Sequence, residues 1–234
     1  MMDLFERQWQ TYRAVVDNDW MEHGGITAAT QEAVESWFNQ HPTRYGKARL
    51  LDLGCGDLAQ MAPVFRMLPL GAYVGVDLTE QVLPMARAAL GATPFSVDFV
   101  HADVRAAIGA GDEPFDLVHA SLVLHHLPDD EKVDFLVALR PHLSHGGAFV
   151  WADVFREPGE SRSDYVARYA ARIRRDWLEL PEDEREAIVT HMSTFDFPAD
   201  REEIVTLVEQ AGWNWRWLWK GHHQAEAVAL LTLI

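Results

Sequence analysis

The chain has little cysteine, no long apolar run and few basic residues, and each scarcity excludes a class of protein. Its 234 residues include one cysteine, Cys55, which excludes a disulfide framework and a thiolate metal cluster. No apolar run approaches the ~20 residues needed to span a bilayer. The opening sequence MMDLFERQWQ lacks the basic-then-apolar order of a secretory signal. We therefore expect a cytoplasmic protein with no membrane partner.

Positive charge is outweighed by negative charge. Lys and Arg number 20 against 36 Asp and Glu, which gives a formal net charge of −16. Such a surface repels phosphate backbones at long range, so nucleic acid is not the expected partner. With 48% apolar residues, the chain is long enough to bury one well-packed domain. The composition thus indicates a single domain and argues against a nucleic-acid partner, and the function must be inferred from motifs.

Short apolar runs alternate with helical patterns over residues 49–153. The apolar runs are LLDL, YVGVDL, FSVDFVHAD, FDLVHAS and GAFVWADV, and helical patterns between them lie near 58–68, 79–90 and 129–139. Buried runs joined by crossover helices indicate a parallel sheet that is covered on both faces. Further helices are predicted near 4–16, around Val34, Trp37 and Phe38, over 161–180 and over 200–210.

The chain closes with two strand patterns, WNWRWLWK and AEAVALLTLI, separated by Gly221-His222-His223-Gln224. A parallel return would need a crossover of about a dozen residues, so this pair is antiparallel. The expected fold is α/β, with a seven-stranded, mainly parallel sheet, an antiparallel C-terminal strand and helices on both faces. Its expected parts are an N-terminal helical lid at 1–48, the core at 49–153, a helical cap at 154–198 and a final helix and hairpin at 199–234.

The segment LLDLGCGDLA, residues 50–59, leads from an apolar run into a glycine-rich turn. Read from Gly54, it satisfies the GxGxxA fingerprint of dinucleotide-binding folds. Read from Asp52, it is D-L-G-C-G, the pattern that S-adenosylmethionine-binding folds place after their first strand. Glycines there let the backbone approach a cofactor closely. The loop alone leaves hydride transfer and methyl transfer both open.

Together the motifs resemble the class I, Rossmann-like S-adenosylmethionine-dependent methyltransferase family, in its small-molecule branch. Asp77 ends the second strand pattern, Asp103 ends the third, and LVLHHLPD follows the fourth. The antiparallel final hairpin also matches, whereas a dinucleotide dehydrogenase usually repeats a parallel half and adds a catalytic domain. Leu58 departs from the family, since many members have a third glycine at that position.

The resemblance implies S-adenosyl-L-methionine as the cofactor and methyl transfer by in-line displacement, with release of S-adenosylhomocysteine. Asp52 would bind the ammonium group, Asp77 the ribose hydroxyls and Asp103 the adenine amino group. The expected cofactor-binding residues are Asp52, Gly54, Cys55, Gly56, Asp77, Leu78, Asp103, Val104, Ala120 and Ser121. No metal is expected, and His222 and His223 are interpreted as part of a surface turn.

In this family the N-terminal helices and the insertion after the fifth strand cover the methyl acceptor. The expected substrate-binding residues are Tyr12, His23, His125, Asp153, Arg156, Tyr165 and Tyr169. The pair Gly24-Gly25 is interpreted as a hinge that lets the lid move. His125 and His126 are candidate catalytic bases because imidazole titrates near neutrality, and the alternative is that they fix the loop.

Several alternatives stay open at this stage. Arg168, Arg172 and Arg175 would grip an anionic molecule or pair with the acidic run PEDERE, and pairing is favoured. A protein of the same fold could use a carboxylated cofactor, or bind the cofactor without catalysis and use its Trp-rich hairpin as an interface, for example in a homodimer. An NAD-binding oxidoreductase is the least favoured function. Release of S-adenosylhomocysteine with some acceptor separates an enzyme from a binding protein.

Overall fold

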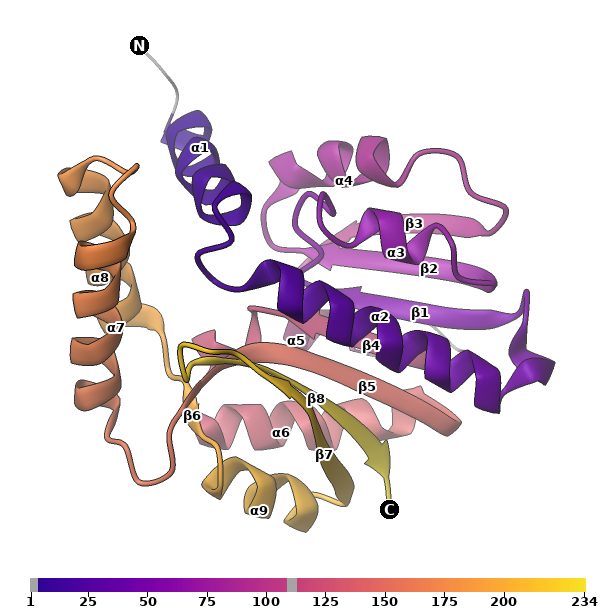
Figure 1. Cartoon of the computed structure of the whole chain (residues 1–234). Coiled ribbons are helices and arrows are strands. Elements are labelled where there is room, and N and C mark those ends of the chain that lie inside the picture. The colour runs from indigo at the N-terminus through magenta and orange to yellow at the C-terminus, as the bar shows by residue number, and fades with distance from the viewer. Residues whose placement is uncertain (1–3, 109–112) are drawn as a thin grey trace.

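A computed structural model describes residues 4–108 and 113–234, which form one central sheet with helices around it (Figure 1). The strands are β1 (Ala48–Leu53), β2 (Leu70–Asp77), β3 (Ser96–His101), β4 (Phe115–Ser121), β5 (Leu143–Arg156), β6 (Ala199–Asp200), β7 (Trp213–Lys220) and β8 (Glu226–Leu233). The helices are α1 (Leu4–Asp17), α2 (His23–Gln40), α3 (Ala62–Phe65), α4 (Leu83–Leu90), α5 (Val104–Ala107), α6 (Asp129–Leu139), α7 (Arg162–Asp176), α8 (Glu182–Phe195) and α9 (Glu203–Gln210). None of these helices combines the length and the apolar character that crossing a bilayer requires.

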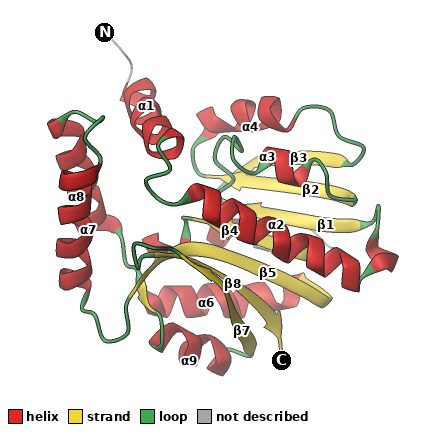
Figure 2. Cartoon of the chain, in the orientation of Figure 1, coloured by secondary structure: helices red, strands yellow, loops and turns green. Residues whose placement is uncertain are grey.

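The sheet has the strand order β3-β2-β1-β4-β5-β8-β7, and the short β6 pairs with β5. β1 to β5 run parallel, while β8 is antiparallel to β5 and β7 is antiparallel to β8. The predicted α/β fold, with a mainly parallel sheet and an antiparallel C-terminal strand, is confirmed (Figure 2). The strand order reverses between β1 and β4, and open α/β sheets bind ligands at the carboxyl ends of the strands beside such a point.

An apolar layer covers each face of the sheet. Trp37 of α2, Phe65 of α3 and Leu90 of α4 belong to one buried cluster. Leu136 of α6 and Val208 of α9 belong to the other, and Figure 1 shows α6 and α9 on the side of the sheet opposite α2. Covering both faces removes water from strands whose side chains are apolar on both sides, which is the arrangement that the continuous apolar runs predict.

The tryptophans of β7 do not keep strict alternation. Trp213, Trp215 and Trp217 pack in the layer that contains α6 and α9. The pairing of β7 with β8 is irregular between Trp217 and Trp219, and Trp219 packs in the opposite layer, that of α2. A bulge of this kind reverses the face on which the following side chain lies, so the period of the sequence alone could not predict it.

The N-terminal segment divides into two helices with different surroundings. α2 packs on the sheet through buried residues that include Ile26 and Val34, so it is part of the core layers. α1 stands beyond the carboxyl ends of the strands, near α8 (Figure 1). Its predicted apolar residues Leu4 and Phe5 have side chains outside the described part of the structure.

The glycine pair is not the hinge that the sequence suggested. Gly24 and Gly25 lie in the first turn of α2, and the connection to α1 is the turn 18–22. In that turn Asp19 and Glu22 have φ values of 54° and 51°. A Cβ at Gly25 would lie 2.3 Å from Cζ2 of Trp219. The absence of a side chain at Gly25 therefore permits close packing of α2 on β7. This role differs from the hinge that the sequence suggested.

The cap consists of two helices, where the sequence indicated one. α7 ends at Asp176, and the acidic run that follows opens α8. Glu182, Asp183 and Glu184 occupy the first turn of α8, where carboxylates interact favourably with the positive end of the helix dipole. The acidic run thus begins a helix, a role that its charge alone did not reveal.

Candidate active site

A cavity of about 980 Å³ opens at the carboxyl ends of the parallel strands. Its walls include the loop after β1, Asp77 at the end of β2, Asp103 after β3 and Ser121 at the end of β4. Cavities of roughly 300–1,000 Å³ are typical of small-molecule and cofactor sites. The position and the size of this cavity therefore fit a nucleoside-sized cofactor together with a second molecule.

The loop after β1 depends on left-handed backbone conformations. Gly54 has φ +67°, and a Cβ there would lie 2.2 Å from Cγ2 of Val123. Gly56 has φ +55° and open space where a Cβ would stand, on the cavity wall. Leu58 takes the position of the missing third glycine and is itself left-handed, with φ 59° and a buried side chain. The loop thus keeps its turn without that glycine.

Asp52 lies behind this loop and is bonded on both carboxylate oxygens. The hydroxyl of Tyr73 donates to Oδ2 at 2.7 Å, and Nδ1 of His119 lies 2.6 Å from Oδ1. Because a carboxylate only accepts, the proton is on Nδ1, and Nε2 of His119 presents a lone pair. That Nε2 is buried, has no hydrogen-bond partner within residues 4–108 and 113–234, and belongs to a residue of the cavity wall.

Asp77 and Asp103 each organise a backbone turn at the rim of the cavity. Asp77 accepts from the backbone N–H of Gly56 at 2.9 Å and of Thr79 at 2.8 Å. Asp103 caps α5 and binds the guanidinium of Arg105 through both oxygens, at 3.0 and 2.8 Å. The hydrogen bond from Arg105 lowers the pKa of Asp103, so this carboxylate stays charged. Arg105, which sequence reasoning missed, also lines the cavity.

The expected cofactor-binding residues come together, with one exception. Nine of them line this cavity, namely Asp52, Gly54, Cys55, Gly56, Asp77, Leu78, Asp103, Val104 and Ser121. The exception is Ala120, which is buried in the layer of α6. Successive side chains of a strand point to opposite faces, so Ser121 and Ala120 cannot both face the cavity.

Residues from the N-terminal helices and from the end of α8 complete the wall. Trp9 and Tyr12 come from α1, His23 from α2, and His191 and Phe195 from α8. Burial and the charge of Asp57 raise the pKa of Tyr12 to about 12, so its hydroxyl keeps its proton. Burial lowers the pKa of His23, which favours its neutral form.

The other expected acceptor residues do not line the cavity, and the structure corrects that expectation. β5 continues to Arg156, so Asp153 lies within the sheet and is 1% exposed. The guanidinium of Arg156 donates to the backbone oxygen of Pro198 at 2.8 Å. Tyr165 and Tyr169 are buried beneath the cap with Trp177. The face of α7 that carries them packs on protein, so they do not contact the cavity.

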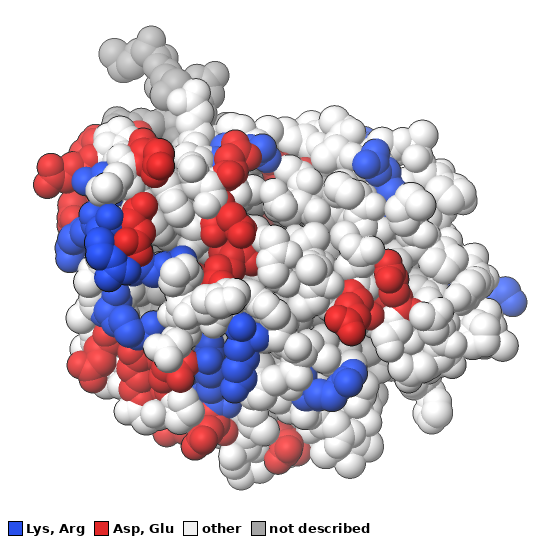
Figure 3. Space-filling view, viewed as in Figure 1, with Lys and Arg blue, Asp and Glu red and all other residues white. Residues whose placement is uncertain are grey.

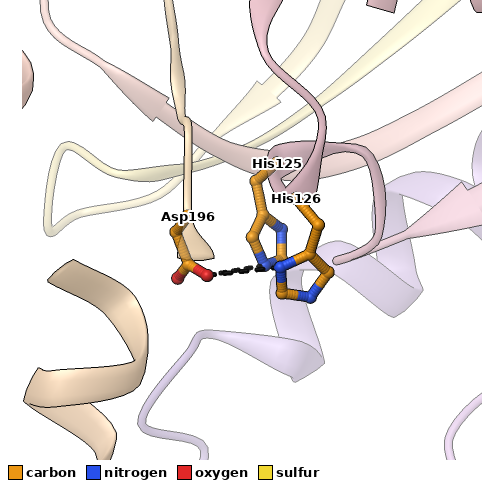
Figure 4. A group of neighbouring side chains, drawn as sticks. All are labelled: His125, His126 and Asp196. Carbon is orange, nitrogen blue, oxygen red and sulfur yellow. Dashed lines mark ion pairs between the residues drawn. The ribbon is translucent and has the colours of Figure 1, made fainter. Parts of the chain in front are cut away.

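His125 and His126, the two expected catalytic histidines, differ in environment. His125 is buried, and its Nδ1 lies 2.6 Å from Oδ1 of Asp153. Burial alone would lower the pKa of His125, but the charge of Asp153 and its hydrogen bond outweigh burial and raise it. His126 lines the cavity, with a side chain 45% exposed and Nδ1 3.3 Å from Oδ1 of Asp196 (Figure 4). Of the two, His126 is the one that a molecule in the cavity can reach.

The arginines of α7 pair with acidic groups of the protein. Arg168 pairs with Glu160 at 2.7 Å and Arg172 with Glu226 at 3.3 Å. Arg175 pairs with Asp176, and Arg174 pairs with Glu186 of the acidic run. Basic and acidic side chains are correspondingly intermixed over α7 and α8 on the face shown in Figure 3. These arginines are paired, but the partners of Arg168, Arg172 and Arg175 lie outside the acidic run that the favoured interpretation named, and Arg174 is paired with Glu186 of that run.

Comparison with known proteins finds a family model that is similar to part of this chain. Residues 50–147 match the family model described as a methyltransferase domain. This range contains the glycine loop, both rim carboxylates and the histidine pair. A search of curated proteins found no match.

Solved structures share the fold over most of the chain. The plantazolicin methyltransferase BpumL, solved with a triazolic desmethylPZN analogue and SAH, is 14% identical with a TM-score of 0.65, over 99% of this chain and 92% of that one. The magnesium protoporphyrin IX methyltransferase of Synechocystis PCC 6803, solved with SAH, is 14% identical with a TM-score of 0.58, over 90% and 86%. A cyclopropane synthase of Mycobacterium tuberculosis is 19% identical with a TM-score of 0.52, over 73% of this chain and 57% of that one. At such identities the likeness concerns the fold.

Proposed function

We propose that this chain is a member of the class I, Rossmann-like S-adenosylmethionine-dependent methyltransferase family, which it resembles, and that it transfers a methyl group to a small-molecule acceptor and releases S-adenosylhomocysteine. One observation carries the proposal. The glycine loop and the carboxylates of Asp77 and Asp103, which lie far apart in the sequence, line a single cavity together with His126. The residues expected to bind the cofactor and a residue expected to act on the acceptor therefore line the same cavity.

The residues present fit the cofactor. Gly56 leaves open space at the wall, and the orphaned Nε2 of His119 offers a buried acceptor for an ammonium group. We assign Asp77 to the ribose hydroxyls and Asp103 to the adenine amino group, and we assign the ammonium to His119, through which Asp52 acts. When bound, S-adenosylmethionine supplies an activated methyl group on a positively charged sulfur.

The acceptor is assigned to the part of the wall that α1, the histidine pair and the end of α8 supply, which we call the acceptor end; its residues are Trp9, Tyr12, His126, Phe195 and Phe197. Aromatic rings there bury apolar surface and exclude water, and alignment of the donor with the acceptor supplies much of the rate of a displacement reaction. The net charge of −16 is further support for a small acceptor over a nucleic acid.

We further propose that α1 is the lid of this site. Arg13 lies 3.6 Å from Asp57 of the glycine loop, and the hydroxyl of Thr11 donates to Glu184 of α8 at 2.7 Å. The helix thus bridges the two walls of the cavity.

The cytoplasm, where S-adenosylmethionine is made, is the compartment that we assign.

The test is direct titration followed by an acceptor screen. Calorimetry should detect binding of S-adenosylmethionine, with no competition by NAD, and a panel of small metabolites should yield acceptor-dependent S-adenosylhomocysteine.

Asp77→Ala should weaken cofactor binding by about 2–3 kcal/mol, because a charge-assisted pair of hydrogen bonds to the ribose is lost.

Three results would contradict the proposal in different ways. Saturable NAD binding that competes with S-adenosylmethionine would indicate an oxidoreductase. Cofactor binding without product for any acceptor would indicate a binding protein. An unchanged affinity in folded Asp77→Ala would remove the assignment of the ribose.

A further inference from the structure

Three ring nitrogens converge on one carboxylate oxygen at the acceptor end of the cavity. Oδ1 of Asp196 lies 3.3 Å from Nδ1 of His126, 3.8 Å from Nε2 of His125 and 3.7 Å from Nε2 of His191. Figure 4 shows the rings of His125 and His126 side by side with the Asp196 carboxylate next to them. The histidine pair follows β4 and Asp196 follows α8, so the fold brings these groups together over a long stretch of sequence.

When the ring of His125 is neutral, the groups in this cluster face one another as acceptors. Nδ1 of His125 then donates to Asp153, and Nε2 presents a lone pair on the side of Asp196. Oδ1 of Asp196 is buried and has no hydrogen-bond partner among the residues that the structure describes. A buried carboxylate oxygen beside an imidazole lone pair is unfavourable unless something positive lies between them.

The spacing suits a metal ion. Zn²⁺ binds imidazole nitrogen and carboxylate oxygen at about 2.0–2.2 Å, which puts tetrahedral donor atoms roughly 3.3–3.5 Å apart. The donor atoms of His125, His126 and Asp196 all lie within 4.8 Å of one another. The nitrogens of His126 and His125 lie 3.3 and 3.8 Å from Asp196, which is at most about half an ångström longer than the tetrahedral edge.

His125 also has the support that a metal-binding histidine needs. Its Nδ1 bonds Asp153, whose other oxygen accepts from Nε1 of Trp151 at 2.9 Å. A carboxylate behind a histidine fixes the ring orientation and makes the outer nitrogen a better ligand. The arrangement has a buried scaffold on one side and the open cavity on the other.

We propose that His125, His126 and Asp196 bind a divalent transition-metal ion of the Zn²⁺ type at the acceptor end of the cavity. This proposal differs from the sequence-based expectation of no metal. Each residue type alone was uninformative, and the site becomes visible when Asp196, from another part of the chain, lies beside the histidine pair.

The role of the ion in catalysis rests on the proposed function, whereas its binding does not. A hydroxyl of the acceptor that coordinates the ion has a lowered pKa, so its proton leaves to water. The oxygen lone pair then forms the new bond to the methyl carbon, and the electrons of the breaking carbon–sulfur bond stay on sulfur, which becomes a neutral thioether. The site therefore favours acceptors with a hydroxyl group.

The test measures Zn²⁺ binding to the whole chain after treatment with a chelator and without any cofactor. Calorimetry should find one Zn²⁺ per chain, and His126→Ala and Asp196→Ala should each weaken binding by about tenfold or more. Co²⁺ offers a second readout, since its visible absorption reports the coordination geometry. His222→Ala is the matched control, because His222 also pairs with a carboxylate, Glu22, at 2.9 Å, but its side chain is 91% exposed and does not line the cavity. It should bind Zn²⁺ like the wild type.

The inference fails if the wild type binds no Zn²⁺, or if folded His126→Ala binds it as tightly as the wild type. The first result would mean that a proton alone occupies the space between His125 and Asp196. Circular dichroism checks each variant, and the exposed His126 is the substitution least able to disturb folding. Release of S-adenosylhomocysteine by a protein that binds no Zn²⁺ would remove the metal and leave the proposed function intact. Zn²⁺ binding without methylation of any acceptor would do the reverse.

Discussion

At the scale of single residues, substitutions at two glycines distinguish the effect of backbone strain on stability from the effect of lost contact with the cofactor. Gly56 has φ +55° and Gly91 has φ +66°, and neither has an atom within 4 Å of an added Cβ. Alanine at Gly56 should cost about 1–2 kcal/mol in stability, because left-handed backbone is unfavourable for any side chain. Alanine at Gly91 should cost about 1–3 kcal/mol, because its φ of 66° and ψ of −154° lie in a region that is essentially restricted to glycine. Only Gly56 lines the cavity. We expect Gly56→Ala alone to weaken S-adenosylmethionine binding, by tenfold or more in calorimetry. Equal affinities in the two variants would exclude this loop as the cofactor cradle.

Residues at strand ends were predictable, and residues that act through strand register were not. Asp77 and Asp103 follow apolar runs directly, so their position at the sheet edge can be read from the sequence. His119 reaches Asp52 because the two are register partners in the pairing of β4 with β1. They are 67 residues apart, and nothing in the local pattern of either strand specifies which residues pair. The register is determined by the packing of the whole sheet.

At the scale of elements, the packing of α2 on β7 gives a matched pair of substitutions. Gly25→Ala would put its Cβ 2.3 Å from the Trp219 ring, whereas a Cβ at Gly24 would meet Asp19 at an ordinary 3.4 Å. Overpacking of this kind costs about 1–3 kcal/mol. Gly24→Ala should be neutral or stabilise by up to ~1 kcal/mol, because alanine is the better helix former. Urea unfolding compares the two, and a Gly25→Ala protein as stable as Gly24→Ala would mean that α2 can shift away from β7.

A second prediction concerns the link between α7 and the chain before it. Arg168 binds Glu160 through two nitrogens, at 2.7 and 2.9 Å, in a partly buried position. The hydrogen bonds of Arg168 lower the pKa of Glu160. A lowered carboxylate pKa stabilises the fold above the unfolded pKa of about 4.3, and this stability is lost as the pH falls through the folded pKa. Glu160→Gln should therefore cost about 1–2 kcal/mol at neutral pH and progressively less in acid.

The matched control for this link is Glu186→Gln. Glu186 and Arg174 have the same bidentate geometry, at 2.6 and 2.7 Å, but both side chains are exposed to solvent. Exposed pairs of this kind contribute little to stability. Urea unfolding between neutral and acidic pH should show a pH-dependent loss for Glu160→Gln only. The same loss in both variants would mean that burial does not strengthen the first pair.

The positions of most helices and strands were predicted correctly, whereas the surroundings of their side chains were predicted less well. Each parallel strand and the closing hairpin appear where apolar runs predict them, because burial on both faces demands such runs. The sequence did not reveal α8, whose buried residues within the helix are limited to Met192. It also assigned Tyr165 and Tyr169 to the acceptor, since a buried helix face has the same spacing whether it covers protein or ligand.

At the scale of the whole molecule, α1 is attached firmly at one end. Trp20, in the turn after it, stacks on Trp177 with ring centroids 5.1 Å apart and planes 9° apart. The guanidinium of Arg172 donates to the backbone oxygen of Trp20. Deleting the chain through Gly24 would remove this anchor and expose Trp177, so the loss of the lid and damage to the cap could not be separated. Substitutions on the cavity side of α1 avoid that problem.

The last prediction concerns enclosure of the acceptor by this helix. Trp9→Ala with Tyr12→Ala removes two aromatic side chains from the cavity wall and leaves Trp20 and the sheet unchanged. Alanine is favourable in a helix, so α1 should persist. Water would then enter the acceptor end, and turnover of the identified acceptor should fall by ~100-fold or more, while cofactor affinity changes within about tenfold. Tyr45→Ala is the control, because Tyr45 is 48% exposed, close to the 42% of Tyr12, and lies outside the cavity wall. A folded double variant with full turnover would show that α1 does not enclose the acceptor.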